Sequence, residues 1–131
     1  MNKKRIYFAH PINTYNTILE TWYFNKIFKP FLNEIEVINP NTEECQTGYA
    51  KYGMEYFKDL VQSCDSVYVL PFEDNSIGAG IHKEVVWAME KNIPCIITKL
   101  NFDFEQIWRL DTLDQQVKIL SVEETRAKLK E

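Results

Sequence analysis

The sequence has no long hydrophobic run and no basic stripe, and these two absences limit what it can bind. Its 131 residues include 15 Lys and Arg against 19 Asp and Glu, which gives a formal net charge of −4. No apolar run approaches the roughly 20 residues that a membrane-spanning helix needs, and the first residues lack the apolar centre of a signal peptide. We therefore expect a cytoplasmic protein that binds neither membranes nor nucleic acid.

Closely spaced cysteines are also missing. The three cysteines, Cys45, Cys64 and Cys95, form no CxxC pair and no Cys/His pattern typical of zinc. An odd number of cysteines without a signal peptide favours reduced thiols, and free cysteines are usually buried. The sequence predicts no metal and no cofactor.

The length and composition are typical of one folded domain. Hydrophobic residues make up 45% of the chain and charged residues 26%, and we find no internal repeat, linker or low-complexity tract. A chain of this length can bury a core without disulfides or metals. We therefore treat residues 1–131 as a single domain.

Strand-like and helix-like segments alternate along the chain. The β-prone segments are residues 5–10, 34–39, 65–71, 94–98 and 117–120. Helical patterns cover residues 15–31, 54–64 and 81–92, a short helix is expected at 104–110, and a capping box at Ser121–Glu124 starts the last helix. Residues 41–53 and 73–80 are interpreted as loops.

This alternation predicts an α/β fold in which helices cover both faces of a parallel sheet. Five strands favour a flavodoxin-like (Rossmann-like) sheet in the order 2-1-3-4-5. Ligands of such sheets bind at the carboxyl ends of the strands. The segments to inspect are therefore residues 9–13, which include His10 and Asn13, residues 71–80, and the chain from residue 98 onward.

Three side chains from separate segments are expected at this edge. Tyr7 lies near the end of the first strand, Asp59 in the helix before the central strand, and Glu84 about one turn into the helix that follows a glycine turn. Each also has a simpler interpretation: a core tyrosine, a solvated aspartate, and a glutamate that favours the helix dipole. Together, a carboxylate nucleophile, a second carboxylate and a tyrosine suit glycosidic chemistry, which needs no metal.

The motifs that carry these residues also resemble a known family. They are Arg5-Ile-Tyr-Phe8, Lys58-Asp-Leu60 with Ser63-Cys-Asp65, Ser76-Ile-Gly-Ala-Gly80 and Glu84-Val-Val-Trp-Ala88. From residue 4 to about 98, the chain resembles the nucleoside 2-deoxyribosyltransferase superfamily, which includes nucleoside 5′-monophosphate N-hydrolases. The resemblance implies that Glu84 is the nucleophile, Tyr7 the active-site tyrosine and Asp59 the catalytic aspartate.

The glycine turn leaves two alignments open. The family places one residue between its second glycine and its glutamate, whereas three lie between Gly80 and Glu84 here. Either two residues are inserted, and Ser76 corresponds to the phosphate-binding serine of the hydrolases, or Gly80 takes the place of the first glycine and Gly78 that of the serine. The resemblance implies that Ser76, with the backbone of Gly78 and Gly80, holds the sugar or a 5′-phosphate.

The function expected from the sequence is cleavage or transfer at the N-glycosidic bond of a nucleoside or nucleoside 5′-monophosphate. The Ser76 hydroxyl favours a 5′-monophosphate, to which His10 could add positive charge. A nucleotide-binding module without turnover and an NAD-cleaving enzyme are the alternatives. The resemblance also implies a homodimer, and the first helix, with Trp22, Phe28 and Phe31 on more than one face, agrees unless the C-terminal segment covers it.

Overall fold

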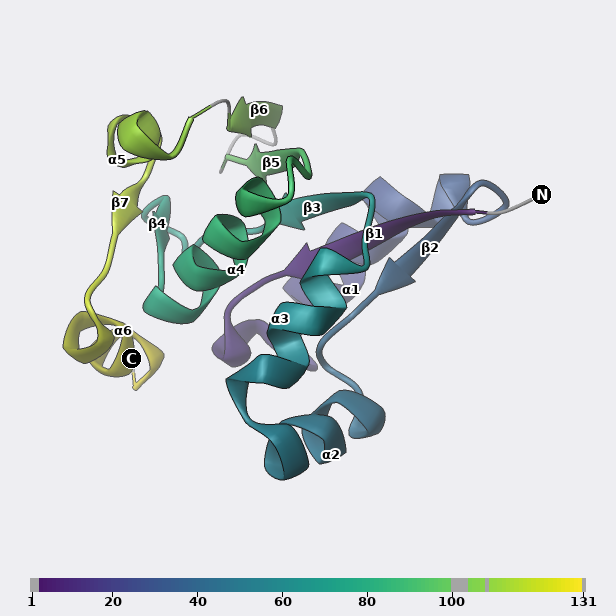
Figure 1. Ribbon diagram of the computed structural model, residues 1–131, viewed down its shortest axis with the longest axis horizontal. Coiled ribbons are helices and arrows are strands. Elements are labelled where there is room, and N and C mark those ends of the chain that lie inside the picture. The colour runs from purple at the N-terminus through teal and green to yellow at the C-terminus, as the bar shows by residue number, and fades with distance from the viewer. Residues whose placement is uncertain (1–2, 100–103, 108, 131) are drawn as a thin grey trace.

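The protein is an α/β domain with a Rossmann-like central sheet. We describe a computed structural model over residues 3–99, 104–107 and 109–130. The strands are β1 (Lys4–Ala9), β2 (Ile35–Ile38), β3 (Ser66–Val69), β5 (Cys95–Thr98) and β6 (Phe104–Ile107) (Figure 1). They lie in the order β2-β1-β3-β5-β6, and the first four are parallel. The first four strands therefore take the predicted order.

The fifth strand of the sheet differs from the prediction. Residues 104–107 form β6, which pairs antiparallel with β5, and not the expected short helix. The Ile107 side chain is buried against the sheet, whereas that of the preceding Gln106 is only half-buried, as expected for successive residues of a strand. Residue 108, which the expected short helix also included, lies outside the described residues. The expected last strand is β7 (Lys118–Ile119), which instead pairs with the two-residue β4 (Ser76–Ile77) in a separate sheet.

Helices cover both faces of the main sheet. Alternate residues of β1 point to opposite sides, so Tyr7 and Ala9 belong to one core cluster and Ile6 and Phe8 to the other. On the first side lie α3 (Met54–Gln62) and α4 (Ala79–Glu90) (Figure 1). On the second side lies α1 (Ile18–Tyr23), which continues as a π-helical turn (Phe24–Phe28) and a 3-10 turn (Lys29–Phe31).

The segment expected to be a loop at 41–53 contains the helix α2 (Glu43–Tyr52). Its first turn is capped by the Thr42 hydroxyl, which accepts a hydrogen bond from the Cys45 amide at 3.1 Å. Gly53 ends the helix with a φ of 67°. Gly48 lies against the Tyr56 ring, where a side chain would clash. Gly48 is therefore required for the packing between α2 and α3.

The C-terminal part packs against the start of α4. The helix α6 (Val122–Leu129) begins with the predicted capping box at Ser121 and Glu124. It follows a 3-10 turn (Leu110–Thr112) and a one-turn helix, α5 (Leu113–Gln116). Another 3-10 turn, Ile12–Thr14, follows β1.

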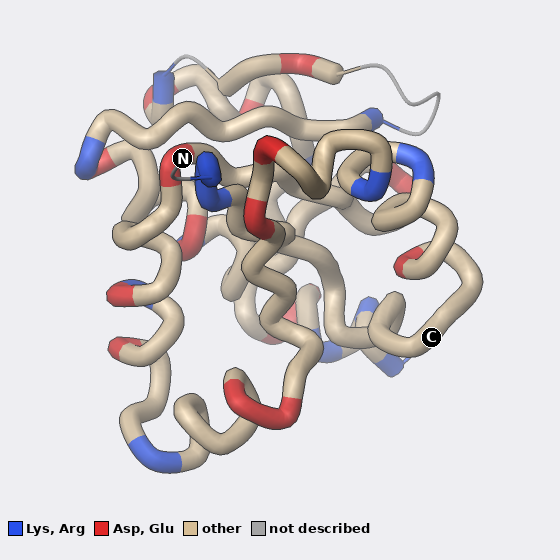
Figure 2. The backbone as a smooth tube through the Cα atoms, turned by 90° about the vertical axis from the view of Figure 1, so that its right-hand side faces the viewer, with Lys and Arg blue, Asp and Glu red and all other residues tan. Residues whose placement is uncertain are grey.

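Lysines and arginines are interspersed with acidic residues along the backbone (Figure 2). In the described residues, no helix is long and apolar enough to cross a membrane.

Candidate active site

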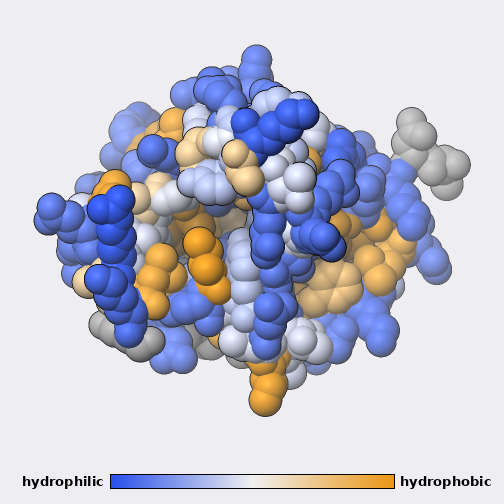
Figure 3. Space-filling view, turned by 90° about the horizontal axis from the view of Figure 1, so that it is seen from below, coloured by the Kyte–Doolittle hydropathy of each residue, from blue (hydrophilic) through white to orange (hydrophobic). Residues whose placement is uncertain are grey.

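A cavity of about 450 Å³ opens beside the carboxyl ends of β1 and β3 and the start of α4. Its volume is in the range of small-molecule sites, roughly 300–1,000 Å³. Hydrophobic side chains gather around a hollow on this face of the molecule (Figure 3). The lining residues come from seven segments, and they are Tyr7, His10, Pro11, Ile12, Tyr15, Pro40, Gln46, Tyr49, Met54, Phe57, Phe72, Gly78, Gly80, Ile81, Glu84, Thr125 and Leu129.

Glu84 is the one carboxylate among these described lining residues. It lies on α4, and burial raises its pKa from an ordinary 4.5 to about 7, although a hydrogen bond with the Tyr7 side chain acts in the opposite direction. At neutral pH, protonated and ionised forms of Glu84 are therefore both populated. Such a perturbed carboxyl group in a cavity is typical of catalytic sites.

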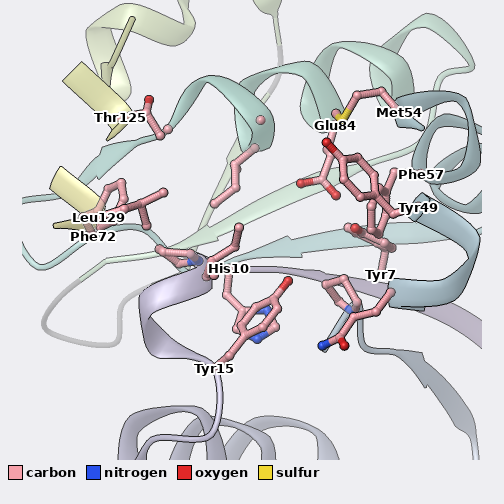
Figure 4. A pocket seen from close by; sticks show the side chains of 17 residues that line it. Tyr7, His10, Tyr15, Tyr49, Met54, Phe57, Phe72, Glu84, Thr125 and Leu129 are labelled. Carbon is pink, nitrogen blue, oxygen red and sulfur yellow. The ribbon is translucent and has the colours of Figure 1, made fainter. Parts of the chain in front are cut away.

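Tyr7 is placed beside Glu84 by the alternation of β1. Its side chain is only 1% exposed, and its ring faces the α4 side of the sheet. Burial raises its pKa well above the ordinary value, and the Glu84 charge raises it further. The phenol therefore stays protonated and can donate its hydrogen to Glu84. The sequence prediction that these two residues meet at the strand edge agrees with this placement (Figure 4).

Aromatic rings that the sequence analysis did not single out form much of the wall. Tyr15 follows β1 and faces Glu84 across the cavity, and its pKa is raised by burial first and by the Glu84 charge second (Figure 4). Tyr49 of α2 and Phe57 of α3 contact each other, with ring centroids 5.6 Å apart. Tyr15 lies just past the segment inspected after β1, and Tyr49 was missed because α2 was expected to be a loop.

His10 lines the cavity, but its ring nitrogens are engaged elsewhere. Nε2 is 2.6 Å from a carboxylate oxygen of Glu20, and Nδ1 is 2.9 Å from the Phe8 carbonyl oxygen. Asn13, also expected to bind the substrate, lies exposed in the 3-10 turn after β1 and is not a lining residue. The nitrogens of His10 are therefore not available to a ligand in the cavity, and Asn13 does not reach it.

Ser76 is buried and turned away from the cavity. Its hydroxyl donates to Asp74 Oδ1 at 2.5 Å, and the other Asp74 oxygen accepts from Lys128 at 2.9 Å. These hydrogen bonds, that of Ser76 first, lower the pKa of Asp74 to about 2. The expected phosphate contact from Ser76 is therefore absent from the described arrangement, because β4 points this side chain at its own turn.

The two glycines of the turn do line the cavity, and one is sterically required. A Cβ atom at Gly78 would lie 2.8 Å from Thr125 Cγ2 on α6, whereas one at Gly80 would have no atom within 4 Å. The Thr125 hydroxyl also accepts a hydrogen bond from the Ala79 amide at 2.9 Å. Gly78 thus lets α6 close one end of the cavity.

Asp59 does not reach the cavity. It is exposed on α3, whereas Phe57, two positions earlier, lines the cavity and Val61 is fully buried. Two residues advance a helix by about 200°. Phe57 and Val61 therefore point toward the protein interior, whereas Asp59, between them, points to solvent. The expected second carboxylate of the site is therefore on the surface.

No known family model matches the chain, and no curated protein matches it. Among solved structures, a conserved protein from Enterococcus faecalis V583 has the same fold. Its crystal structure superposes with a TM-score of 0.56 at 19% sequence identity, and the match covers 97% of this chain and 99% of that one. At this identity the likeness supports the α/β fold along the whole chain and carries no function.

Proposed function

We propose that this protein cleaves or exchanges the N-glycosidic bond of a nucleoside or nucleotide, with Glu84 as the nucleophile. The observation that carries the proposal is a half-buried carboxyl group, hydrogen-bonded to Tyr7, inside an aromatic cavity large enough for a nucleoside. The resemblance of the surrounding motifs to the deoxyribosyltransferase superfamily agrees with it. The three residues between Gly80 and Glu84 do not prevent Glu84 from facing the cavity (Figure 4).

In this mechanism an ionised Glu84 oxygen forms a bond to C1′ of the sugar while the bond from C1′ to the base nitrogen breaks. The electron pair of that bond leaves with the base, which then takes up a proton. The transition state resembles an oxocarbenium ion, which the adjacent negative charge stabilises. Tyr7 donates to Glu84 and orients it. Water or a second base then attacks C1′ while the bond from C1′ to the Glu84 oxygen breaks and its electron pair returns to Glu84. The proton that the attacking group loses goes to solvent, which balances the proton that the departing base took up.

The departing base needs a hydrogen-bond donor that Asp59 does not supply from the surface of α3. Tyr15 lies near Glu84, and its raised pKa keeps the phenol protonated. We assign Tyr15 the role of donating a hydrogen bond to the departing base. Tyr49 and Phe57 provide flat apolar surface against which a heteroaromatic base can stack.

The phosphate preference no longer rests on Ser76, whose hydroxyl is bonded to Asp74. The backbone of Gly78 and Gly80, at the start of α4, remains beside the cavity and could bind a hydroxyl group or a phosphate. A comparison of each nucleoside with its 5′-monophosphate decides between the two substrate classes. We also propose, as the sequence analysis expected, that the protein is cytoplasmic. The order of the four parallel strands supports a flavodoxin-like classification of the fold.

A binding module without turnover is the second candidate. Its specific support is that Glu84 is the one carboxylate among the described lining residues, so the paired carboxylates of many glycosidases are not both present in the cavity. Such a module would hold a nucleotide against the aromatic wall and release no base.

A chromatographic screen of nucleosides, nucleoside 5′-monophosphates and NAD separates these candidates. The proposal expects free base from at least one nucleoside or monophosphate, and loss of that release in Glu84→Ala. A matched control is Glu90→Gln, at the exposed end of the same helix. Release of nicotinamide from NAD would instead favour the NAD-cleaving alternative. Thermal stabilisation by a ligand without any product would favour the binding module.

We also propose a homodimer. On α1 and the turns that follow it, Ile18, Trp22 and Phe31 keep 88%, 41% and 52% of their surface exposed. The C-terminal helix α6 packs against α4, on the other side of the sheet, so it does not bury these residues. Light scattering at micromolar concentration should show a species of twice 15.5 kDa, and a monomer alone would contradict the proposal.

A further inference from the structure

Glu20 lies outside the cavity, yet its carboxylate joins the segments that form one wall of it. The residue is 8% exposed on α1. It accepts hydrogen bonds from three donors: His10 Nε2 at 2.6 Å, the Asn16 backbone amide at 3.1 Å, and the Asn41 side-chain amide, 3.0 Å from each carboxylate oxygen. Glu20 thus connects the loop after β1 with the loop after β2.

Two ring contacts and two hydrogen bonds hold the His10 ring. It stacks on Phe8 with ring centroids 3.8 Å apart and an interplanar angle of 10°. The Tyr15 ring also contacts it, with ring centroids 4.8 Å apart and an interplanar angle of 44°. Since both ring nitrogens are engaged with Glu20 and the Phe8 carbonyl, His10 presents only ring carbon surface to a ligand. Its contribution to the cavity is to support Tyr15.

The hydrogen bonds also decide where the protons lie. The Phe8 carbonyl can only accept, so His10 Nδ1 carries a hydrogen. Glu20 receives donors from Asn16 and Asn41, and although burial opposes ionisation, these bonds and that of His10 lower the pKa of Glu20. An ionised Glu20 also accepts, so His10 Nε2 carries a hydrogen as well. The pKa of His10 is lowered, chiefly by burial of the ring, but beside an ionised Glu20 the two acceptors at its nitrogens are both satisfied only when both nitrogens carry a hydrogen.

We propose that Glu20 is a positioning residue that, through His10, holds Tyr15 and the loop after β1 against the cavity beside Glu84. The pair is a fixed support: its hydrogen-bonding atoms are engaged within the protein and not with a ligand, and it determines where the Tyr15 phenol lies relative to Glu84. The positioning of Tyr15 by Glu20 and His10 can be tested in the ligand-free protein, whereas its effect on catalysis rests on the proposed function.

The test compares Glu20→Gln with Glu90→Gln by NMR, in ligand-free protein with labelled histidine and tyrosine rings. His82, the other histidine of the chain, serves as a reference in the same spectra. In the wild-type protein near pH 7 we expect a hydrogen on both His10 nitrogens. In Glu20→Gln, one of them should lose its hydrogen and the Tyr15 ring signals should move, whereas Glu90→Gln should match the wild type. Base release by Glu20→Gln should fall about tenfold to a hundredfold, mainly in kcat.

Two results would overturn the proposal: a wild-type His10 Nε2 without hydrogen near pH 7, or unchanged Tyr15 signals in Glu20→Gln. If that variant fails to fold, the wild-type His10 spectrum still decides whether the pair exists as described. If the wild-type protein releases no base from any substrate, the proposed function fails, and the spectra of the free protein judge the role of Glu20 separately.

Discussion

Replacing Glu84 by Gln should stabilise the protein at alkaline pH. In the folded protein the pKa of Glu84 is about 7, against 4.5 for an ordinary glutamate. The shift is upward, so the protonated carboxyl group contributes stability that is fully present below pH 4.5 and is lost as the pH rises through about 7. Gln keeps the size of the side chain and a carbonyl that can accept from Tyr7, but it cannot ionise.

The size of the effect follows from the two pKa values. Each pH unit between them is equivalent to about 1.4 kcal/mol, so the full loss of stability is about 3.5 kcal/mol. Most of this loss, about 2–3 kcal/mol, falls between pH 5 and pH 8. That is a large part of the roughly 5–15 kcal/mol by which domains are stable.

The assay is urea unfolding of the wild-type protein and Glu84→Gln at pH 5 and pH 8. All other titrating groups are common to both proteins, so they cancel in the difference between the two pH dependences. We expect the wild-type protein to lose about 2–3 kcal/mol more than the variant between these pH values. Equal losses in both proteins would refute the assignment of Glu84 as a half-buried, reluctantly ionised group.

Two further predictions concern the pH profile and the glycine turn. If ionised Glu84 is the nucleophile, kcat/KM for base release should rise with pH through a midpoint near 7, and a fall there would show that the protonated form is required. Gly78→Ala brings a Cβ atom within 2.8 Å of Thr125 Cγ2, so it should lower the free energy of unfolding by about 1–3 kcal/mol, as a thermal melt measures. Gly80→Ala, with open space, is its control, and equal melting temperatures for the two variants would contradict the close packing of α6.

The sequence predicted the regular part of the sheet well, because three of its strands contain continuous, mostly apolar segments. The strands β1, β3 and β5 contain Phe8, Val69 and Ile97, all fully buried, and hydrophobicity alone marks such strands. The edge of the sheet was harder. Residues 104–107 carry only one deeply buried side chain, Ile107, so the strand depends on pairing with β5, a contact that local pattern does not encode.

The helix α2 shows how polar composition can conceal a helix. Only Cys45 and Gly48 are buried in it, so it lacks the apolar stripe by which helices are recognised. Its beginning did carry a signal, since Thr42 precedes Glu43 and Glu44 as a capping residue precedes acidic residues in a first turn. Missing this helix also meant missing Tyr49 in the wall of the cavity.

The candidate site was predictable where it depended on the strand edge and unpredictable where it depended on side-chain direction. Tyr7 and Glu84 lie at positions that the topology brings together, and the structure places both in the cavity. Asp59 lies in the expected helix but points to solvent, and Ser76, expected in a loop, lies in the short strand β4 and points to Asp74. These directions depend on helix phase and on one local hydrogen bond.

The most direct test of the central claim is mass spectrometry of the protein after reaction with a substrate. A nucleoside with fluorine at C2′ suits this purpose, because the fluorine destabilises the oxocarbenium-like transition state and slows breakdown of the glycosyl–enzyme. After acid quenching and proteolysis, the account predicts a sugar bound covalently to the peptide that contains Glu84, and no such adduct in Glu84→Gln. Release of base without any adduct, at an undiminished rate in Glu84→Gln, would contradict it.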